Sequence, residues 1–265
     1  MHKGDFEGLI KMSAEKIHTQ TEPSQVDGKC PSGGASFLAQ YKDLRGYDLL
    51  KVFLLDLYPG DLALVSSFGA ESAVLLHMVS EIAPDTPVVF LETGKLFQQT
   101  LSYKAQLIDV LGLTNVQSAY PNAGLLGKTD PKGTLWQDDP DACCNMRKVL
   151  PLQEALRPFS GWITGRKRYQ SDARQSLSAI EQDSYKLKLN PLVDFSHDDI
   201  KTYFKDHNLP QHPLVRQGYA SIGCEVCTSK PTTDDPRSGR WAHKKDKTEC
   251  GIHFIDGRIV RNNNS

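Results

Sequence analysis

Apolar residues in this chain follow two kinds of pattern from about Tyr47 onward. Some form short continuous runs bounded by turn residues, which is typical of strands buried on both faces of a sheet. Others recur with the spacing of an amphipathic helix. The predicted strands cover residues 62–65, 87–91, a weak segment around 116, and 161–164.

Helical patterns lie between these runs. Residues 72–79 and a stretch around 101–108 carry apolar residues at helical spacing. Asp141 is a suitable N-cap residue, so we expect a helix to begin at Ala142. Ser196-His-Asp-Asp199 resembles a capping box, with Asp in place of the usual Glu or Gln, and predicts another helix.

The alternation of strand and helix predicts an α/β fold with a mostly parallel central sheet and helices on both faces. Ligands of such sheets bind beyond the carboxyl ends of the strands. The polar loops 66–72, 92–94 and 165–168 each follow a predicted strand. We therefore expect one cleft to collect all three loops.

The two ends of the chain differ in composition from its middle. We expect residues 1–40 to be a mobile leader, residues 41–230 to form the α/β domain, and residues 231–265 to form a C-terminal segment. After Thr228 the sequence is polar and basic, and we expect it to add little to the hydrophobic core. A polar, glycine-containing stretch of this kind fits a mobile lid over a binding cleft.

Bulk composition narrows the class of protein. The 265 residues are 39% hydrophobic and 24% charged, with a formal net charge of −1, which is typical of a globular domain and not of a dedicated nucleic-acid binder. No apolar run approaches the length of a membrane span, and the first residues lack the apolar core of a signal peptide. We therefore expect a cytoplasmic protein with no nucleic-acid or membrane partner and with reduced cysteines.

Four of the six cysteines form two pairs, Cys143 next to Cys144 and Cys224-x-x-Cys227. Four thiols in two pairs fit a sulfur-ligated metal site, either zinc or an iron–sulfur cluster. Neighbouring helical residues point about 100° apart, which the four iron corners of a cubane accommodate better than one zinc ion. Zinc and buried structural cysteines remain the alternatives. Cys30 has no activating neighbour, and we expect no role for it.

Cys250 follows a basic stretch that contains Arg237 and Arg240. Nearby cations favour the thiolate, so Cys250 is a candidate nucleophile, and the two arginines could grip phosphate or sulfate oxygens. Lys148 comes one helical turn after Cys144 and would face either a metal centre or a bound anion. The alternative for the basic stretch is a solvated tail, and for each cation it is an ordinary surface charge.

Two strand-end loops are further candidates for anion binding. Ser66-Ser-Phe-Gly-Ala-Glu-Ser72 joins a strand to the start of a helix, where backbone N–H groups and hydroxyls can hold an oxyanion. It is not a Walker loop, because the G-K-[ST] ending is missing. Arg166, Lys167 and Arg168 could supply a second anion clamp. The alternatives are an ordinary turn and ordinary surface charges.

Together these motifs resemble the assimilatory sulfonucleotide reductases, and more narrowly the bacterial adenosine 5′-phosphosulfate (APS) reductases that carry an iron–sulfur cluster. The resemblance extends from about Leu62 to His253. In this family, enzymes restricted to the 3′-phosphorylated substrate, PAPS, lack the four cysteines, so the resemblance points to APS. The motifs that carry it are Ser66-Ser-Phe-Gly-Ala-Glu71, Glu92-Thr-Gly-Lys-Leu-Phe97, Cys143-Cys144 with Arg147-Lys148, Gly165 with Arg168-x-Gln170-Ser171, Cys224-x-x-Cys227 and Lys247-Thr-Glu-Cys-Gly-Ile-His253.

The resemblance implies a nucleotide-binding fold of the PP-loop type and assigns roles to single residues. It implies a [4Fe-4S] cluster with a structural and electrostatic role, held by Cys143, Cys144, Cys224 and Cys227. The implied substrate-binding residues are Ser66, Ser67, Phe68, Gly69, Ala70, Glu71, Leu91, Thr93, Gly94, Lys148, Gly165, Arg168, Arg237, Arg240 and His253.

In the implied reaction, Cys250 attacks the sulfur of APS and expels AMP, which leaves an enzyme S-sulfocysteine. Thioredoxin then attacks this adduct and releases sulfite. No thioredoxin-like domain follows residue 265, so we expect the thioredoxin to be a separate protein. The resemblance also implies a homo-oligomer.

Three other functions remain as alternatives. Ser72 and Tyr169 depart from the family pattern and leave room for an enzyme that accepts PAPS as well as APS. An ATP-dependent tRNA-thiolating enzyme shares the fold, but the loop lacks the paired glycines expected for ATP. A non-enzymatic cluster or zinc module gives no reason for Cys250 beside His253 and two arginines.

Overall fold

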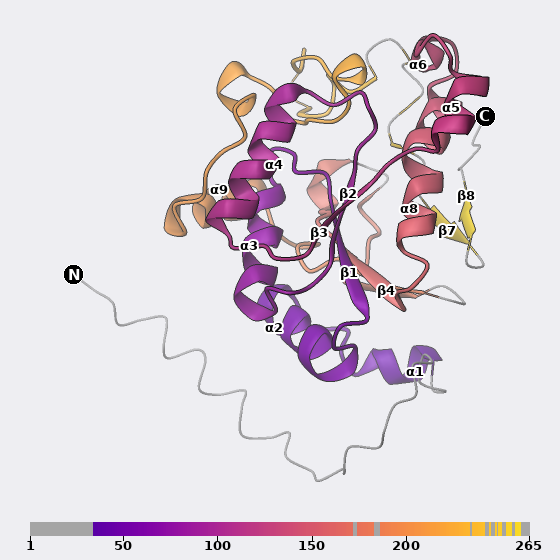
Figure 1. Ribbon diagram of the computed structural model, residues 1–265. Coiled ribbons are helices and arrows are strands. Elements are labelled where there is room, and N and C mark those ends of the chain that lie inside the picture. Colours follow the sequence, from indigo (N-terminus) through magenta and orange to yellow (C-terminus); the bar gives the residue numbers. More distant parts are fainter. Residues whose placement is uncertain are drawn as a thin grey trace.

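The computed structural model describes residues 34–171, 174–182, 186–233, 235–241, 244, 247, 249 and 250, with 34–36, 253–255 and 258–260 described as backbone only. Within these residues the centre is a six-stranded sheet with the order β3-β2-β1-β4-β6-β5 (Figure 1). Only β5 runs antiparallel to its neighbour in this sheet. Its strands are β1 Leu62–Ser66, β2 Val88–Leu91, β3 Val116–Ala119, β4 Gly161–Thr164, β5 Ile180–Gln182 and β6 Leu187–Leu189.

The strand order reverses at β1. This strand pairs with β2 on one side and with β4 on the other. In the sequence, β2 and β3 lie between β1 and β4. A reversal of this kind leaves a crevice outside the carboxyl ends of the two strands, where ligands bind in open α/β sheets. The loops that follow β1, β2 and β4 therefore start at one edge of the sheet, as predicted.

Helices cover both faces of the sheet (Figure 1). Leu64 of β1 belongs to the larger core, formed with α2 Gly46–Lys51, α3 Ser72–Ile82, α4 Gln98–Val110 and α9 His197–Asp206. The preceding residue, Ala63, faces the opposite core with Leu152 and Trp162, beneath α8 Leu150–Ala155. This alternation of neighbouring apolar residues between two cores explains why the predicted strand is a continuous apolar run. The α/β fold class is confirmed.

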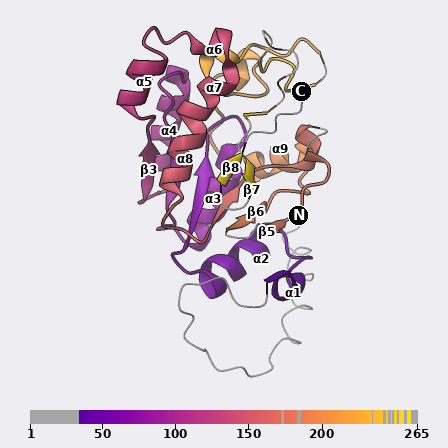
Figure 2. The same cartoon turned by 90° about the vertical axis from the view of Figure 1, so that its right-hand side faces the viewer.

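Short elements complete the described part of the chain. Near the C-terminus, strands β7 His253–Ile255 and β8 Arg258–Val260 pair antiparallel, and β8 lies beside α8 (Figure 2). Among the described residues, no helix combines the length and apolar character that crossing a membrane requires. The short elements are α1 Gly34–Ala39, the wider turns Val52–Leu57 and Asn145–Val149, α5 Ala123–Thr129, α6 Leu135–Asp138, α7 Pro140–Cys144, the tight turns Arg168–Gln170, Val215–Gln217 and Glu225–Cys227, β7 His253–Ile255 and β8 Arg258–Val260.

The start of the helix that carries the paired cysteines differs from the prediction. Asp139, not Asp141, is its N-cap, and its carboxylate accepts a hydrogen bond from Ala142 N at 2.8 Å. Pro140 occupies the first turn, where its missing N–H costs nothing. Asp141 instead pairs with Lys247. The predicted capping box is confirmed: Ser196 Oγ accepts from Asp199 N, and Asp199 Oδ2 accepts from Ser196 N.

Both predicted end segments contribute to the folded core. Leu38 of α1, within the predicted leader, is buried in the larger core, while residues 1–33 lie outside the described part of the chain. Trp241 is only 1% exposed and packs against Cys224 and Cys227. The expectation that the chain after Thr228 adds little to the core was therefore wrong. The polar composition of this segment did not indicate its contribution, because the contribution comes from one large ring and not from a run of smaller apolar residues.

Candidate active site and metal centre

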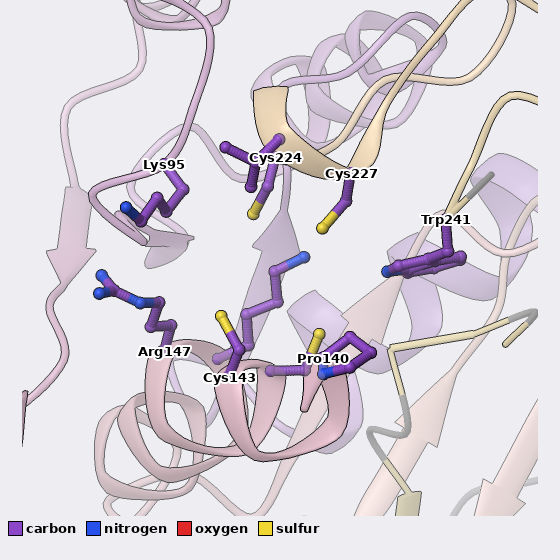
Figure 3. A pocket seen from close by; sticks show the side chains of 10 residues that line it. Lys95, Pro140, Cys143, Arg147, Cys224, Cys227 and Trp241 are labelled. Carbon is purple, nitrogen blue, oxygen red and sulfur yellow. The ribbon is translucent and has the colours of Figure 1, made fainter. Parts of the chain in front are cut away.

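Four cysteines from two distant parts of the chain line one pocket, called here the cysteine pocket (Figure 3). Cys143 and Cys144 belong to α7, while Cys224 precedes the tight turn Glu225–Cys227 and Cys227 ends it. All four side chains are buried, and the sulfur atoms of Cys143, Cys224 and Cys227 point into a common space. The other residues that line the pocket are Lys95, Pro140, Arg147, Lys148, Val226 and Trp241.

The C-x-x-C turn is attached by backbone to the loop that follows β2. Cys227 N donates to Cys224 O at 3.0 Å, which closes the turn, and Glu225 N donates to Lys95 O at 2.7 Å. Thr93, which is 1% exposed, places its Oγ1 3.4 Å from Cys224 Sγ. The strand-end loop 92–94 thus supports one pair of thiols directly.

Trp241 closes the cysteine pocket on another side. Its backbone N donates to Cys227 O at 3.0 Å, and the guanidinium of Arg240 lies 4.5 Å from the centre of its ring. Trp241 also has a φ of +50°, a conformation that is uncommon for a bulky residue. Such strain persists only where the surrounding contacts hold it, and it is frequent at functional sites.

Arg147 is a buried cation at the rim of the pocket. Its Nη2 donates to Asp130 Oδ2 at 2.7 Å and its Nη1 donates to Thr93 O at 2.8 Å. The remaining Nε is buried and has no hydrogen-bond partner among the described residues, and the same holds for Arg240 Nε. A buried donor without an acceptor is costly, so Arg147 Nε fits a pocket whose occupant is an anion.

The chemistry of the donor set fits a sulfur-ligated centre. Thiolates are the ligands of zinc and of iron–sulfur clusters. Within the described residues, however, no group of three or more His, Cys, Asp or Glu side chains is gathered closely enough to hold a single metal ion. The four thiols share one pocket without converging on one point in it.

Cys250 packs against the same pocket and differs from the other four thiols. Its Sγ accepts a hydrogen bond from Lys148 Nζ at 3.4 Å. A hydrogen bond from the Cys144 thiol, helped by Lys148 and Arg240 and opposed by burial, lowers the pKa of Cys250 well below its ordinary value. Burial instead raises the pKa of Cys227 to about 11. Cys250 therefore carries a negative charge more readily than Cys227 does.

The predicted anion loop that follows β1 is internally bonded. Phe68 N donates to Ser66 Oγ at 3.2 Å, and Gly69 N donates to Ser72 Oγ at 2.8 Å. The Phe68 side chain is fully buried and packs edge-on against Phe90, so this residue anchors the loop to the core. Any contact of Phe68 with a ligand must therefore use its backbone.

Glu71 ends this loop and accepts three hydrogen bonds. The donors are Lys167 Nζ at 2.8 Å, Tyr169 OH at 2.5 Å and Gln170 Nε2 at 2.9 Å. Burial alone would raise the pKa of Glu71, but the charge and hydrogen bond of Lys167, with the other two donors, hold it below its ordinary value. The loop after β4, which begins at Gly165, thus locks the loop after β1.

The three basic residues 166–168 already have acidic partners in the structure. Arg166 pairs with Glu181, Lys167 pairs with Glu71, and Arg168 pairs with Asp194 at the surface. The guanidinium of Arg168 also donates to Leu177 O. Of the predicted phosphosulfate-binding cations, the structure therefore brings Lys148 and Arg240 to Cys250, but it does not bring Arg168 there.

Two other predicted residues lie at the C-terminal segment. Arg237 Nη2 is 3.3 Å from Glu249 Oε2, next to Cys250 in the chain. The backbone of His253 lies in β7, but its side chain lies outside the described part of the structure. Leu91 and Thr93 stand at the carboxyl end of β2, and Gly94 follows with a positive φ of 67°.

Comparisons with known proteins agree with this geometry. Residues 61–230 match the model of the phosphoadenosine phosphosulfate reductase domain, which covers more than half of the chain. An adenosine 5′-phosphosulfate reductase of Mesorhizobium japonicum is 45% identical over 86% of this chain and 90% of its own. The enzyme of the same name from Bacillus cereus is 38% identical over 74% of this chain and 86% of its own. The chain belongs to the sulfonucleotide reductase family.

Solved structures support the same fold. The phosphoadenylyl-sulfate reductase of Candida auris superposes with a TM-score of 0.56 at 25% identity, covering 69% of this chain and 96% of that one. The FMN adenylyltransferase of Candida glabrata superposes with a TM-score of 0.51 at 16% identity, over 85% of this chain and 82% of that one. The second likeness shows the fold alone. The predicted family resemblance is confirmed, and membership in the sulfonucleotide reductases favours an enzyme over a non-enzymatic metal module.

Sequence reasoning on this sulfonucleotide reductase did not select three residues that the structure places at the site. Trp241 closes the cysteine pocket, and Arg174 and Glu249 form an ion pair beside Cys250. A tryptophan within a basic stretch was the available signal for the first. No sequence signal pairs Arg174 with Glu249, because the two residues are 75 positions apart and meet only in the folded chain.

Proposed function

We propose that this chain reduces adenosine 5′-phosphosulfate to sulfite and AMP, with Cys250 as the nucleophile. The family and the names of its curated relatives support the substrate. The observation that carries the proposal is the Cys250 thiol, 3.4 Å from the Lys148 ammonium and with a pKa well below its ordinary value. A thiolate that forms readily is the form that attacks.

The proposed reaction has two displacements. The Cys250 thiolate attacks the sulfur of the sulfuryl group, so an S–S bond forms, the bond from sulfur to the AMP oxygen breaks, and AMP leaves with the electron pair. A thioredoxin thiolate then attacks Cys250 Sγ and expels sulfite. Its second thiol resolves the mixed disulfide, which oxidises thioredoxin by two electrons and restores the Cys250 thiolate.

Substrate would bind at the carboxyl edge where the strand order reverses. The loop 66–71, with the main chain near Leu91, Thr93, Gly94 and Gly165, would hold the nucleotide, since these loops start from adjacent strands. Lys148, Arg237 and Arg240 would neutralise the phosphosulfate beside Cys250. Arg168 and His253 stay proposed contacts that follow from the family resemblance.

The four buried cysteines would hold a [4Fe-4S] cluster, the group that the family resemblance implies. When bound, it supplies a fixed structural centre and an anionic charge beside the active site. Arg147 Nε and Arg240 Nε, buried and without partners in the described chain, would donate to that anion. A ligating Cys144 has no S–H to donate, so Lys148 and Arg240 would then keep Cys250 ionised.

The runner-up within the family is an enzyme that reduces PAPS as well as APS. The four cysteines favour APS, and the relatives at 38–45% identity are named for APS. Turnover of both nucleotides by the same preparation decides the preference. We expect a separate thioredoxin as reductant, a homo-oligomer, and a cytoplasmic location.

The decisive experiment is labelling with radiosulfur APS after anaerobic purification and without reductant. We expect label on the wild type and on a Cys30→Ser control, none on Cys250→Ser, and release of labelled sulfite by thioredoxin. An unlabelled wild type with its metal centre intact would remove the proposal and favour the ATP-dependent alternative.

A further inference from the structure

Arg174 forms a two-pronged contact with the residue that precedes Cys250. Its Nε donates to Glu249 Oε1 at 2.7 Å and its Nη2 donates to Glu249 Oε2 at 2.9 Å. The Arg174 and Glu249 side chains are only 15% and 24% exposed. A bidentate pair of this kind fixes orientation as well as distance. Because Glu249 is joined to Cys250 by one peptide bond, the pair restricts where the Cys250 thiol can lie.

Two further groups bind the same carboxylate. Arg237 Nη2 lies 3.3 Å from Glu249 Oε2, and Ser171 Oγ donates to Glu249 Oε1 at 3.4 Å. Burial alone would raise the pKa of Glu249, but the hydrogen bonds and charge of Arg174, with the charge of Arg237, hold it below its ordinary value. Glu249 is therefore an anion surrounded by donors.

Arg174 also reaches the predicted nucleotide loop through one intermediate. Its Nη1 donates to Gln170 Oε1, and Gln170 Nε2 donates to Glu71 Oε2 at 2.9 Å. Glu71 is the last residue of the loop 66–71. A continuous series of side-chain hydrogen bonds thus connects the loop after β1 to the C-terminal segment.

We propose that Arg174 is a positioning residue, which holds Glu249 and through it Cys250 beside Lys148, and which Gln170 ties to Glu71 of the nucleotide loop. The inference rests on the proposed function, in which Cys250 is the nucleophile. Arg174 itself needs no contact with the substrate in this role. A misplacement of about 1 Å at a reacting group is enough to cost about 100-fold in rate, so a residue outside the reacting atoms can control the first displacement.

The test compares Arg174→Gln and Glu249→Gln with the wild type, using the anaerobic holoenzyme with its metal centre loaded. Arg174→Lys keeps the charge but loses the bidentate geometry. Arg157→Gln is the matched control, because Arg157 pairs with Glu154 on the surface and is 74% exposed. The first readout is the rate at which iodoacetamide alkylates Cys250 without substrate, followed by mass spectrometry at alkaline pH. The second is single-turnover formation of the sulfur adduct over a range of APS concentrations.

We expect Cys250 to be alkylated about 10-fold faster in both Gln variants. This corresponds to a loss of about 1.4 kcal/mol in the free energy that holds the segment around Cys250 in place. The maximal rate of adduct formation should fall about 10- to 100-fold, with half-saturation by APS within about twofold of the wild type. Arg174→Lys should give values between those of the wild type and those of the Gln variants. Arg157→Gln should match the wild type.

Two results would overturn the inference. Alkylation rates equal to the wild type would show that the pair does not hold Cys250. A raised half-saturation constant with an unchanged maximal rate would make Arg174 a substrate-binding residue instead. If Arg174→Gln does not fold, Ser171→Ala, which removes one donor to Glu249, is read in the same way with a smaller effect. If the wild type forms no adduct, the proposed function fails, while the alkylation rates still decide whether Arg174 holds the segment.

Discussion

Cys227 lines the cysteine pocket and Cys250 packs against it, but different forces hold the two residues in place. Cys227 is fixed by backbone: its N donates to Cys224 O, and its carbonyl accepts from Trp241 N, both at 3.0 Å. Cys250 is held through side chains, by Lys148 at 3.4 Å and by the ion pair of its neighbour Glu249 with Arg174 at 2.7 Å. The position of Cys227 is therefore fixed, whereas the position of Cys250 depends on charged side chains that can release it.

The pKa values follow the same division. Burial raises the pKa of Cys227 to about 11, whereas a Cys144 hydrogen bond and two cations lower the pKa of Cys250 well below its ordinary value. A buried, backbone-fixed thiol suits a ligand that is deprotonated once, when metal binds. A readily ionised thiol on a side-chain-held segment suits a nucleophile that must meet first a small substrate and then a protein.

The largest expected effect concerns Trp241, on the side of the cysteine pocket that backbone hydrogen bonds hold. Trp241→Ala removes a ring that is 1% exposed and packs against Cys224 and Cys227, and it should cost about 3–5 kcal/mol of unfolding free energy. Trp241→Phe retains an aromatic ring and should lose less. Chemical denaturation of the anaerobic protein measures both. Equal stability of Trp241→Ala and the wild type would show that the ring covers the pocket without supporting it.

The next effect belongs to the side-chain-held thiol. Lys148→Met removes the donor to Cys250 Sγ and should slow adduct formation about 100-fold, the usual cost of losing one charged group at a reacting centre. Lys128→Met, on the exposed end of α5, is the matched control. Single-turnover labelling gives the rate. A change in rate below about threefold would exclude Lys148 from the chemical step. Each tenfold change in rate corresponds to about 1.36 kcal/mol of activation free energy.

Much of this division could be predicted from sequence, because its local signals are strong. The strands at 62–65, 87–91 and 161–164 are short apolar runs, and the structure places them at Leu62–Ser66, Val88–Leu91 and Gly161–Thr164. The two cysteine pairs were grouped correctly for a related reason, since thiols that are adjacent or three positions apart point to a shared site. Neither inference needed a long-range contact.

The parts that sequence did not predict are mainly short elements and contacts that depend on long-range packing. Strands β5 and β6 have only three residues each, too few to show a period. The guanidinium of Arg168 pairs with Asp194, a partner that no pattern in the sequence indicates. Arg174 and Glu249 lie 75 positions apart. A cation in sequence looks the same whether its partner will be a ligand or a carboxylate of the same chain.

A smaller effect concerns pH and the loop end of the Arg174 network. The pKa of Glu71 is held below its ordinary value by Lys167, Tyr169 and Gln170 against the effect of burial. A depressed carboxyl pKa adds stability above the unfolded value of about 4.3, and this stability is lost as pH falls through the folded value. Glu71→Gln should therefore lose about 1–3 kcal/mol at neutral pH and show a flatter decline toward acid.

Denaturation at several pH values between neutral and acid measures this decline. Glu154→Gln is the control, because Glu154 is 66% exposed in its pair with Arg157 and should keep the wild-type profile. A Glu71→Gln profile parallel to the wild type throughout would mean that the Lys167 pair does not contribute to the pH dependence of folding.

The smallest effect separates the two cysteine environments without any substitution. At 1 M salt the screening length falls to about 3 Å, which weakens ion pairs open to solvent more than buried ones. Glu249 and Arg174 are partly exposed, so the alkylation rate of Cys250 should rise about two- to threefold, an effect below 1 kcal/mol. The backbone bonds that hold Cys227 carry no net charge, so the rate at which a chelator removes metal from the proposed centre should stay constant. Equal changes in both rates would mean that salt loosens the whole pocket, and that one set of forces holds both thiols.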